Sequence, residues 1–283
     1  YYNAVGERVD RPRRGLMTRP GLDEVHAYRT RVDRDLVKLI GDADDALRER
    51  IEPLITIGIH HEQQHQELIQ TDLKHVLSHN PLRPVYRDRE HRPMAPTPEL
   101  TWFGHDGGLY TIGRDEATGG DFAYDNEGPR HQVYLRPFAI ASRPVTNGEF
   151  IAFIEDGGYE RADLWLDMGW ATVNERGWGH PLYWEKRDGA WWQFSLAGMQ
   201  RVMDDEPVTH VSLFEADAYA RWAGRRLPTE QEWEVAAAAA DADAGHFVES
   251  ERLHPRGFEP DMPADRPMKM FGDCWEWTRS QYE

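Results

Sequence analysis

The sequence has almost no cysteine. Cys274 is the only one in 283 residues, so an internal disulfide is excluded, and such a composition suits a reducing compartment. Long apolar runs are lacking too, since no stretch reaches the ~18 residues that a transmembrane helix needs. No signal peptide is visible at the start of the sequence. We therefore expect a cytoplasmic protein with no membrane partner.

Basic charge is scarce. The chain carries 33 Lys and Arg against 50 Asp and Glu, a formal net charge of −17. A nucleic-acid-binding protein needs a basic surface against the phosphates, so nucleic acid is excluded as a partner. Hydrophobic residues make up 40% of the chain and aromatic residues 11%, which is enough for a core. The length favours two domains.

Tryptophan is missing from the first third, because none of the 11 precedes Trp102. This shift in composition indicates two differently built halves. The chain opens at Tyr1 without a methionine and stops at Glu283. We therefore expect a portion of a longer protein, and its oligomeric state is left open.

The first half reads as long helices. Apolar residues recur every three or four positions over residues 22–40, and a second helix is expected over about 52–78. Two long helices with a short connection are typical of part of a helical bundle. Five prolines between residues 79 and 98 then forbid a helix and indicate an extended linker. The apolar positions of the first helix are Val25, Tyr28, Val32, Leu36, Leu39 and Ile40.

The second half alternates short strands, glycine-rich turns and short helices. Strands are predicted at 109–112 and 132–135. Helices are predicted at 147–154, at 213–222, and from 228–229 to about 240. Each has an N-terminal capping signal, which for the last two is a Ser or Thr followed three residues later by Glu. The capping residues are Thr146, Ser212 with Glu215, and Thr229 with Glu232.

The second long helix carries the sequence GIHHEQQHQELIQTDLKH, residues 58–75. His61 and His65 are four residues apart, so their rings lie one turn apart on the same face of a helix. That geometry suits two neighbouring positions on one metal ion. Neutral imidazoles with open positions beside them suit iron(II) and oxygen chemistry.

A zinc hydrolase is the alternative, because residues 61–65 match H-E-x-x-H. The extended form of that motif wants Gly and His where Leu68 and Thr71 stand. Either metal needs a third ligand. Four other histidines are available, although none has persuasive spacing: His26, His75, His79 and His91.

Three blocks of the second half carry a family resemblance. They are DNEGPRHQV (125–133), PVTHVSLFEADAYARWAGRRLPTEQEWEVAA (207–237) and GDCWEWTRSQY (272–282). These blocks resemble the formylglycine-generating-enzyme fold, an irregular C-type-lectin-like α+β domain, over residues 99–283. Residues 1–90 resemble a DinB-like helical bundle, present in part, and 91–98 would be the proline-rich linker. The two in this order resemble the sulfoxide synthases of ergothioneine biosynthesis.

The resemblance implies an oxidoreductase that uses iron(II) and O2. This family joins a cysteine-type thiol, either cysteine or γ-glutamylcysteine, to C2 of the imidazole of hercynine and oxidises the sulfur to a sulfoxide. Three histidines hold its iron. Two match His61 and His65, and the third is expected upstream of Tyr1.

The resemblance also assigns three further residues. Gln64 matches a position that contacts the substrate imidazole. Arg14 matches an arginine associated with the carboxylate of the thiol substrate. Tyr282 matches an active-site tyrosine that donates a proton or hydrogen during C–S bond formation.

Several residues of the second half have simpler explanations. We expect Trp275 and Trp277 in the core, Glu276 and Arg226 as a structural pair or cap, and Cys274 as a small buried residue. Formylglycine generation relies on two cysteines for its metal, so this sequence is expected to lack that activity. An oxygen-rich stretch at residues 125–127 could bind calcium, but a turn is the simpler expectation.

Other functions stay open at this point. The histidine-using synthase of ovothiol biosynthesis shares the architecture and differs in joining sulfur to C5. A lectin-like binding module on a helical stalk, without catalysis, is the alternative from a different class.

Overall fold

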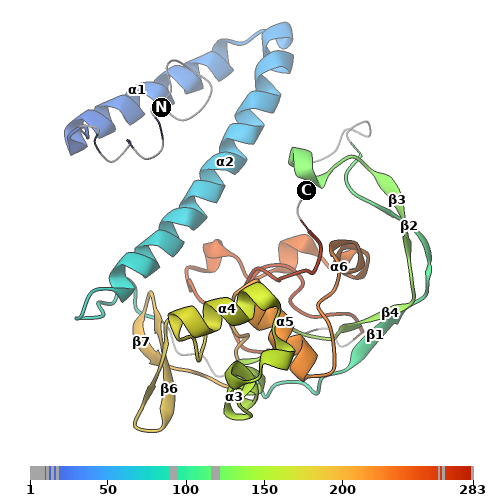
Figure 1. The fold of residues 1–283 in the computed structure, drawn as a ribbon. Helices are drawn as coiled ribbons and strands as arrows, with labels where there is room; N and C mark the ends of the chain where they lie inside the picture. The colour runs from blue at the N-terminus through green and yellow to red at the C-terminus, as the bar shows by residue number, and fades with distance from the viewer. Residues whose placement is uncertain are drawn as a thin grey trace. The chain divides into compact units, whose positions relative to one another are not determined.

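A computed structural model gives the fold of residues 10, 13, 16, 19–89, 95–115, 122–260, 262 and 265–281. The chain divides into two compact units, Tyr1–Gln66 and Glu67–Glu283, and Figure 1 traces the elements of both. Among the described residues, no helix combines the length and apolarity needed to cross a membrane.

The first unit is helical. Helix α1 (Leu22–Asp42) covers the predicted helix. Helix α2 (Asp45–Ser78) begins earlier than predicted because the Asp44 carboxylate accepts a hydrogen bond from Leu47 N at 2.8 Å and starts the first turn. Helix α2 continues through the boundary, so its last part belongs to the second unit. Two helices do not establish a DinB-like bundle, which stays a prediction together with the domain limits 1–90, 91–98 and 99–283.

The second unit mixes small antiparallel sheets with short helices, as expected for an α+β domain. In the part of this unit that the structure describes, the strands form two pairs and one three-stranded sheet. The predicted strands are present as β2 and β3, paired from Gly108–Leu135 to Ile112–His131. The strands are β1 (Trp102–His105), β2 (Gly108–Ile112), β3 (His131–Leu135), β4 (Phe138–Ala141), β5 (Trp184–Arg187), β6 (Ala190–Ser195) and β7 (Gly198–Arg201).

The helices of the second unit surround an aromatic core. Figure 1 shows α3, α4 and α5 beside one another, and buried residues from all three form one hydrophobic cluster around Phe150, Phe153 and Ala218. A second cluster joins Ala236 and Ala237 to Met270. The helices are α3 (Asn147–Glu155), α4 (Asp167–Arg176), α5 (Leu213–Trp222) and α6 (Glu230–Ala237).

Two of these helices start with the same set of contacts, a threonine N-cap and an arginine–glutamate ion pair. In α3, Arg143 binds both carboxylate oxygens of Glu149 at 2.8 and 2.9 Å, and the Thr146 side chain caps the first turn. In α6, Arg226 binds Glu232 in the same way, at 2.7 Å to each oxygen. The N-cap predicted at Thr146 and the capping boxes predicted at Ser212 and Thr229 are therefore confirmed. At Thr146 and Thr229 an arginine three residues before the cap reinforces it.

The short stretch Asp125–Glu127 forms a 3-10 turn, and the turn predicted there from the sequence is confirmed. Glu127 Oε2 accepts a hydrogen bond from Tyr124 N at 2.6 Å. This carboxylate thus closes a turn.

Candidate functional site

The histidine-rich part of α2 carries two imidazoles whose nitrogens face each other. Nε2 of His61 and Nε2 of His65 lie 3.0 Å apart, and the ring centroids are 4.7 Å apart. Both side chains are exposed. One helical turn separates the two residues, so the helix itself places them on one face. We call them the histidine pair.

The distance within the histidine pair fits two adjacent ligands of an octahedral ion. Two nitrogens at about 2.1 Å from a metal lie about 3.0 Å apart across a right angle and about 3.4 Å apart in a tetrahedron. The observed 3.0 Å equals the first value and is also an ordinary hydrogen-bond length between two imidazole nitrogens. Two imidazoles and open positions form part of a non-haem iron(II) donor set. Among the residues the structure describes, no group of three His, Cys, Asp or Glu could hold a metal ion.

The other predicted site residues stay predictions. Gln64 lies on α2 and is exposed. Arg14 and Tyr282 fall outside the described residues, as does His91.

Two histidines that could have been further ligands make other contacts. His75 Nδ1 lies within hydrogen-bonding distance of the Tyr183 hydroxyl at 3.0 Å. His79 Nδ1 donates to the His75 carbonyl oxygen at 2.9 Å. The first contact joins the C-terminal end of α2 to a distant segment of the second unit, and the second is local to the helix end. His26 is exposed on α1.

A buried titratable cluster beside these histidines was missed by sequence reasoning. Lys74 Nζ lies 2.5 Å from His210 Nε2 and 5.0 Å from the centre of the Tyr183 ring. Burial lowers the pKa of Lys74 to about 8. Burial, reinforced by the Lys74 charge, lowers the pKa of His210 to about 3. The two residues are 136 positions apart, so no spacing in the sequence could have indicated the contact.

A fully buried carboxylate holds another part of the second unit. Glu206 is bound by Arg89 and by His254 Nε2, the latter at 3.0 Å. Burial alone would raise the pKa of Glu206, but the hydrogen bond from His254 and the charges of both partners outweigh it and lower that pKa. The contacts join Arg89 to two distant segments of the same second unit.

The two tryptophans of the W-E-W-T segment are more exposed than the sequence predicted. Trp275 is 87% exposed and Trp277 49% exposed, so the prediction that both lie in the core was wrong. Their indole N–H groups are bound instead: Trp275 Nε1 donates to Glu67 Oε1 at 2.5 Å, and Trp277 Nε1 donates to the Val211 carbonyl at 2.9 Å. A tryptophan fixed by its polar edge can keep its faces exposed.

Glu276 and Arg226 were expected as a structural pair or cap, and Arg226 does bind the capping-box residue Glu232. Glu276 does not pair with Arg226. Its Oε2 accepts a hydrogen bond from Trp233 Nε1 at 2.6 Å, and burial raises the pKa of its carboxyl to about 7. Cys274 is half-buried, and desolvation raises the pKa of its thiol to about 12. At neutral pH this thiol is protonated and a poor metal ligand or nucleophile.

Comparison with known proteins identifies the second half. Residues 92–262 match the Sulfatase-modifying factor enzyme 1-like domain. The chain is 41% identical to a hercynine oxygenase of Mycolicibacterium thermoresistibile over 56% of its length and 40% identical to that of Mycolicibacterium smegmatis over 62%. It is 35% identical to a formylglycine-generating enzyme of Thermomonospora curvata, over 53% of this chain and 52% of that one.

The alignments with the two hercynine oxygenases cover 39% and 44% of those proteins. The chain therefore matches less than half the length of these curated relatives.

Proposed function

The chain belongs to the family of Sulfatase-modifying factor enzyme 1-like domains, and from this premise we propose that it forms part of a non-haem iron(II), O2-dependent sulfoxide synthase of ergothioneine biosynthesis. The relatives named hercynine oxygenase support this oxidoreductase activity and its substrate. The observation that carries the proposal is the histidine pair, with nitrogens 3.0 Å apart on a helix that precedes the family domain. A DinB-like fold for the first unit and a cytoplasmic location belong to the same proposal.

The reaction joins C2 of the hercynine imidazole to the sulfur of γ-glutamylcysteine or cysteine. The C2–H and S–H bonds break, and a C–S bond and an S–O bond form. One oxygen atom of O2 enters the sulfoxide, and the other leaves as water with the two hydrogens. The organic substrates thus supply all four electrons that reduce O2, and no further reductant is needed.

The histidine pair would hold the metal through its two Nε2 atoms. A bound iron(II) ion would supply the redox chemistry for O2 and lower the pKa of a coordinated thiol. The third protein ligand would come from residues other than those described, since these contain no complete set.

Three further residues take roles in this proposal by their match to the family. Gln64 would orient the substrate imidazole from the same helix as the histidine pair. Arg14 would bind the carboxylate of the thiol substrate. The Tyr282 phenol would deliver a proton to the oxygen that leaves as water.

Oxygen uptake by the full-length, iron(II)-loaded protein tests the proposal. Hercynine is supplied with cysteine or with γ-glutamylcysteine, and product mass is read in parallel. We expect uptake that needs both substrates and yields a sulfoxide adduct. No uptake by a protein that demonstrably holds iron would refute it.

Product analysis, an anaerobic hydrolysis assay and binding measurements separate the alternatives. Sulfur attached to C5 of histidine would indicate an ovothiol-type synthase. Hydrolysis without O2, lost in Glu62→Gln, would indicate a zinc hydrolase. A protein that binds quaternary amines or sugars but no transition metal would be a lectin-like binding module.

A further inference from the structure

We propose that Ser250, His246 and Asp273 form a nucleophilic triad that hydrolyses small esters, an activity separate from the proposed synthase. All three residues lie in the second unit. Asp273 Oδ1 lies 2.9 Å from His246 Nδ1, and His246 Nε2 lies 2.8 Å from the Ser250 hydroxyl oxygen. The carboxylate, imidazole and hydroxyl therefore form one hydrogen-bonded chain, in the order that nucleophilic serine catalysis requires.

Asp273 holds the imidazole in the reactive tautomer. Its side chain is 2% exposed, and its carboxylate also accepts hydrogen bonds from Arg256 N at 2.9 Å and from Lys269 Nζ at 2.8 Å. Burial alone would raise the pKa of Asp273, but the hydrogen bond from His246 and the charge of Lys269 outweigh it and lower that pKa. An ionised carboxylate accepts the hydrogen of Nδ1, which leaves the lone pair of Nε2 to accept the serine proton.

Ser250 is the exposed end of this chain of hydrogen bonds. It ends the 3-10 turn Val248–Ser250, and its hydroxyl lies 2.8 Å from two acceptors, His246 Nε2 and the Phe247 carbonyl oxygen. The hydroxyl has one hydrogen, so it donates to one acceptor at a time, and donation to Nε2 activates the oxygen as a nucleophile. The backbone N–H of Arg252 donates to the same oxygen at 3.4 Å, which places one donor beside the atom where the reaction begins.

The turn that carries Ser250 also borders a cavity. Val248 and Glu251 lie in the wall of a space of about 160 Å³, together with Tyr86 and Arg87. Sites for drug-sized ligands occupy about 300–1,000 Å³, so a space of this size suits a short acyl or alcohol group and excludes a long lipid chain. Short-chain esters are therefore the substrate class.

The reaction balances with water alone. Ser250 Oγ attacks the ester carbonyl carbon while its proton passes to His246 Nε2. The C–O bond to the alcohol breaks, and Nε2 gives that proton to the departing alcohol. Water then attacks the acyl group on Ser250 and gives a proton to Nε2, and this proton returns to Ser250 as the acid leaves. Ester and water thus become acid and alcohol, with no oxidant or reductant.

Labelling of the full-length protein with a fluorophosphonate probe is the first test. The probe reacts with serines that a histidine activates, and peptide mass spectrometry locates the label. The variants are Ser250→Ala and His246→Asn, since asparagine keeps an N–H that can donate to Asp273 and lacks an equivalent of Nε2. Ser280→Ala is the matched control, because the Ser280 hydroxyl accepts a hydrogen bond from Glu230 N at 2.9 Å and serves a helix end.

We expect label on Ser250 in the wild type and in Ser280→Ala, and labelling at least about 100-fold slower in His246→Asn. Hydrolysis of p-nitrophenyl acetate should fall by a similar factor in Ser250→Ala and His246→Asn and should survive a metal chelator, unlike that of a zinc hydrolase. Absence of label on Ser250 in the wild type would overturn the proposal. Labelling that is unchanged in His246→Asn, or hydrolysis that is unchanged in Ser250→Ala, would also overturn it.

A thiol at the same position gives a second measurement that needs no turnover. The thiol introduced by Ser250→Cys should react with iodoacetamide at pH 7 about tenfold faster than the same thiol in a protein that also carries His246→Asn, since a neighbouring imidazole favours the thiolate. Native Cys274 contributes little, because burial raises the pKa of its thiol to about 12. Thermal unfolding shows that both proteins are folded, and equal alkylation rates in the two would refute the activation of this position by His246.

Discussion

The Lys74 ammonium group donates a hydrogen bond to His210 Nε2 across 2.5 Å, and no carboxylate is among the groups that set the pKa of Lys74. Only 9% of Lys74 is exposed. A buried ammonium group with a neutral partner costs stability, because desolvation disfavours its charged form. The contact joins the end of α2 to another segment of the second unit. It also lowers the free energy of unfolding by an amount that depends on pH.

Lys74→Met is expected to stabilise the protein at pH 7 by about 1–3 kcal/mol. The pKa of Lys74 is about 8 in the folded chain against an ordinary 10.5, so the unfolded chain binds more protons between these values. Wild-type stability should therefore rise with pH across that window, and the advantage of Lys74→Met should shrink. Urea unfolding from pH 6 to 10.5 measures this, with Lys38→Met as the exposed control. An advantage that does not change with pH would contradict it.

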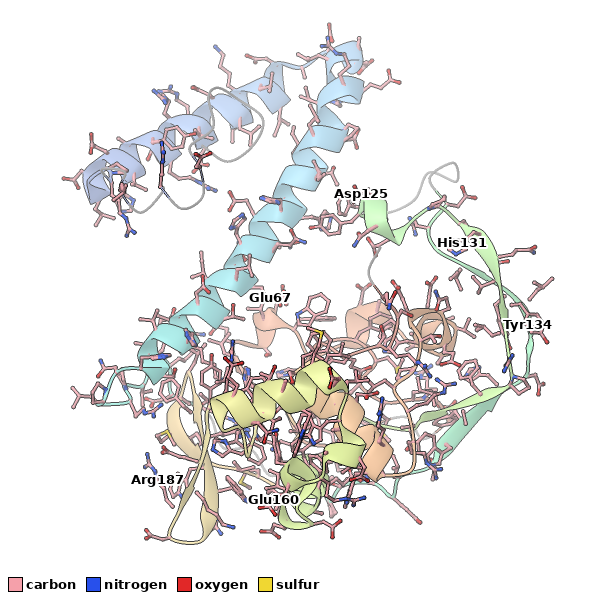
Figure 2. All side chains as sticks on the ribbon, viewed as in Figure 1. Glu67, Asp125, His131, Tyr134, Glu160 and Arg187 are labelled. Atoms are coloured by element: carbon pink, nitrogen blue, oxygen red, sulfur yellow. The ribbon has the colours of Figure 1, made fainter. Side chains whose placement is uncertain are left out.

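His210→Asn is expected to reduce the sensitivity to acid. The folded pKa of His210, about 3, lies below its ordinary 6.5, so its contribution to stability is complete above pH 6.5 and is lost as the pH falls towards 3. Asparagine suits the site because His210 has a φ of 62°, which Asn tolerates better than most residues. Thermal unfolding between pH 7 and 4 should show a shallower decline than in wild type. The control is His131→Asn, at an exposed site on β3 (Figure 2); a parallel decline in wild type and His210→Asn would count against the argument.

Glu232→Gln is expected to destabilise the second unit by about 1–3 kcal/mol. The change removes the charge from a carboxylate that is 9% exposed and bound by both arms of Arg226. The hydrogen bond from Arg226 lowers the pKa of Glu232, so its stabilisation is present above about pH 4.5 and falls below it. Denaturant unfolding at pH 7 and pH 3 checks both statements. Glu230→Gln, at an exposed position of the same helical turn, should cost much less.

Helix starts were predictable because their signals are local. Ser212 and Glu215 lie three residues apart, and helix α5 has the predicted bounds, Leu213–Trp222. The same holds for the histidine pair, since the helical repeat alone brings residues four apart together. Local periodicity was therefore enough to predict that the two proposed ligands lie on one face of the helix.

Long-range partners were not predictable in this way. Lys74 meets His210 through the packing of segments that share no periodicity. Trp275 was expected in the core because tryptophan is usually well buried, but the Glu67 carboxylate, far away in the sequence, binds its N–H and keeps the ring at the surface. Contacts of this kind depend on tertiary structure, which no local pattern in the sequence reports.

Gly158→Ala is expected to destabilise the protein by more than about 2 kcal/mol. A Cβ atom at Gly158 would lie 2.1 Å from a ring carbon of Phe153, and Phe153 is fully buried in the core of the second unit. The ring cannot move away without displacing its aromatic neighbours. Gly179→Ala is the matched control, because its Cβ would meet nothing within 4 Å. Thermal unfolding should show a large fall in Tm for Gly158→Ala alone, and equal Tm values for the two variants would refute the packing argument.

His61→Asn and His65→Asn should each weaken binding of a divalent transition metal by more than about 100-fold. Losing a group that only orients a metal ligand costs about 10–100-fold, so losing a ligand should cost more. His60→Asn is the control, since the adjacent position points about 100° away round the helix. Anaerobic titration of the full-length protein with Co²⁺, read from its visible absorption, measures affinity without any turnover. The histidine pair, whose nitrogens lie 3.0 Å apart, is a metal-binding pair only if both variants lose the absorption band and His60→Asn keeps it. An equal loss in all three would mean that the whole polar face of α2, and not the pair, determines binding.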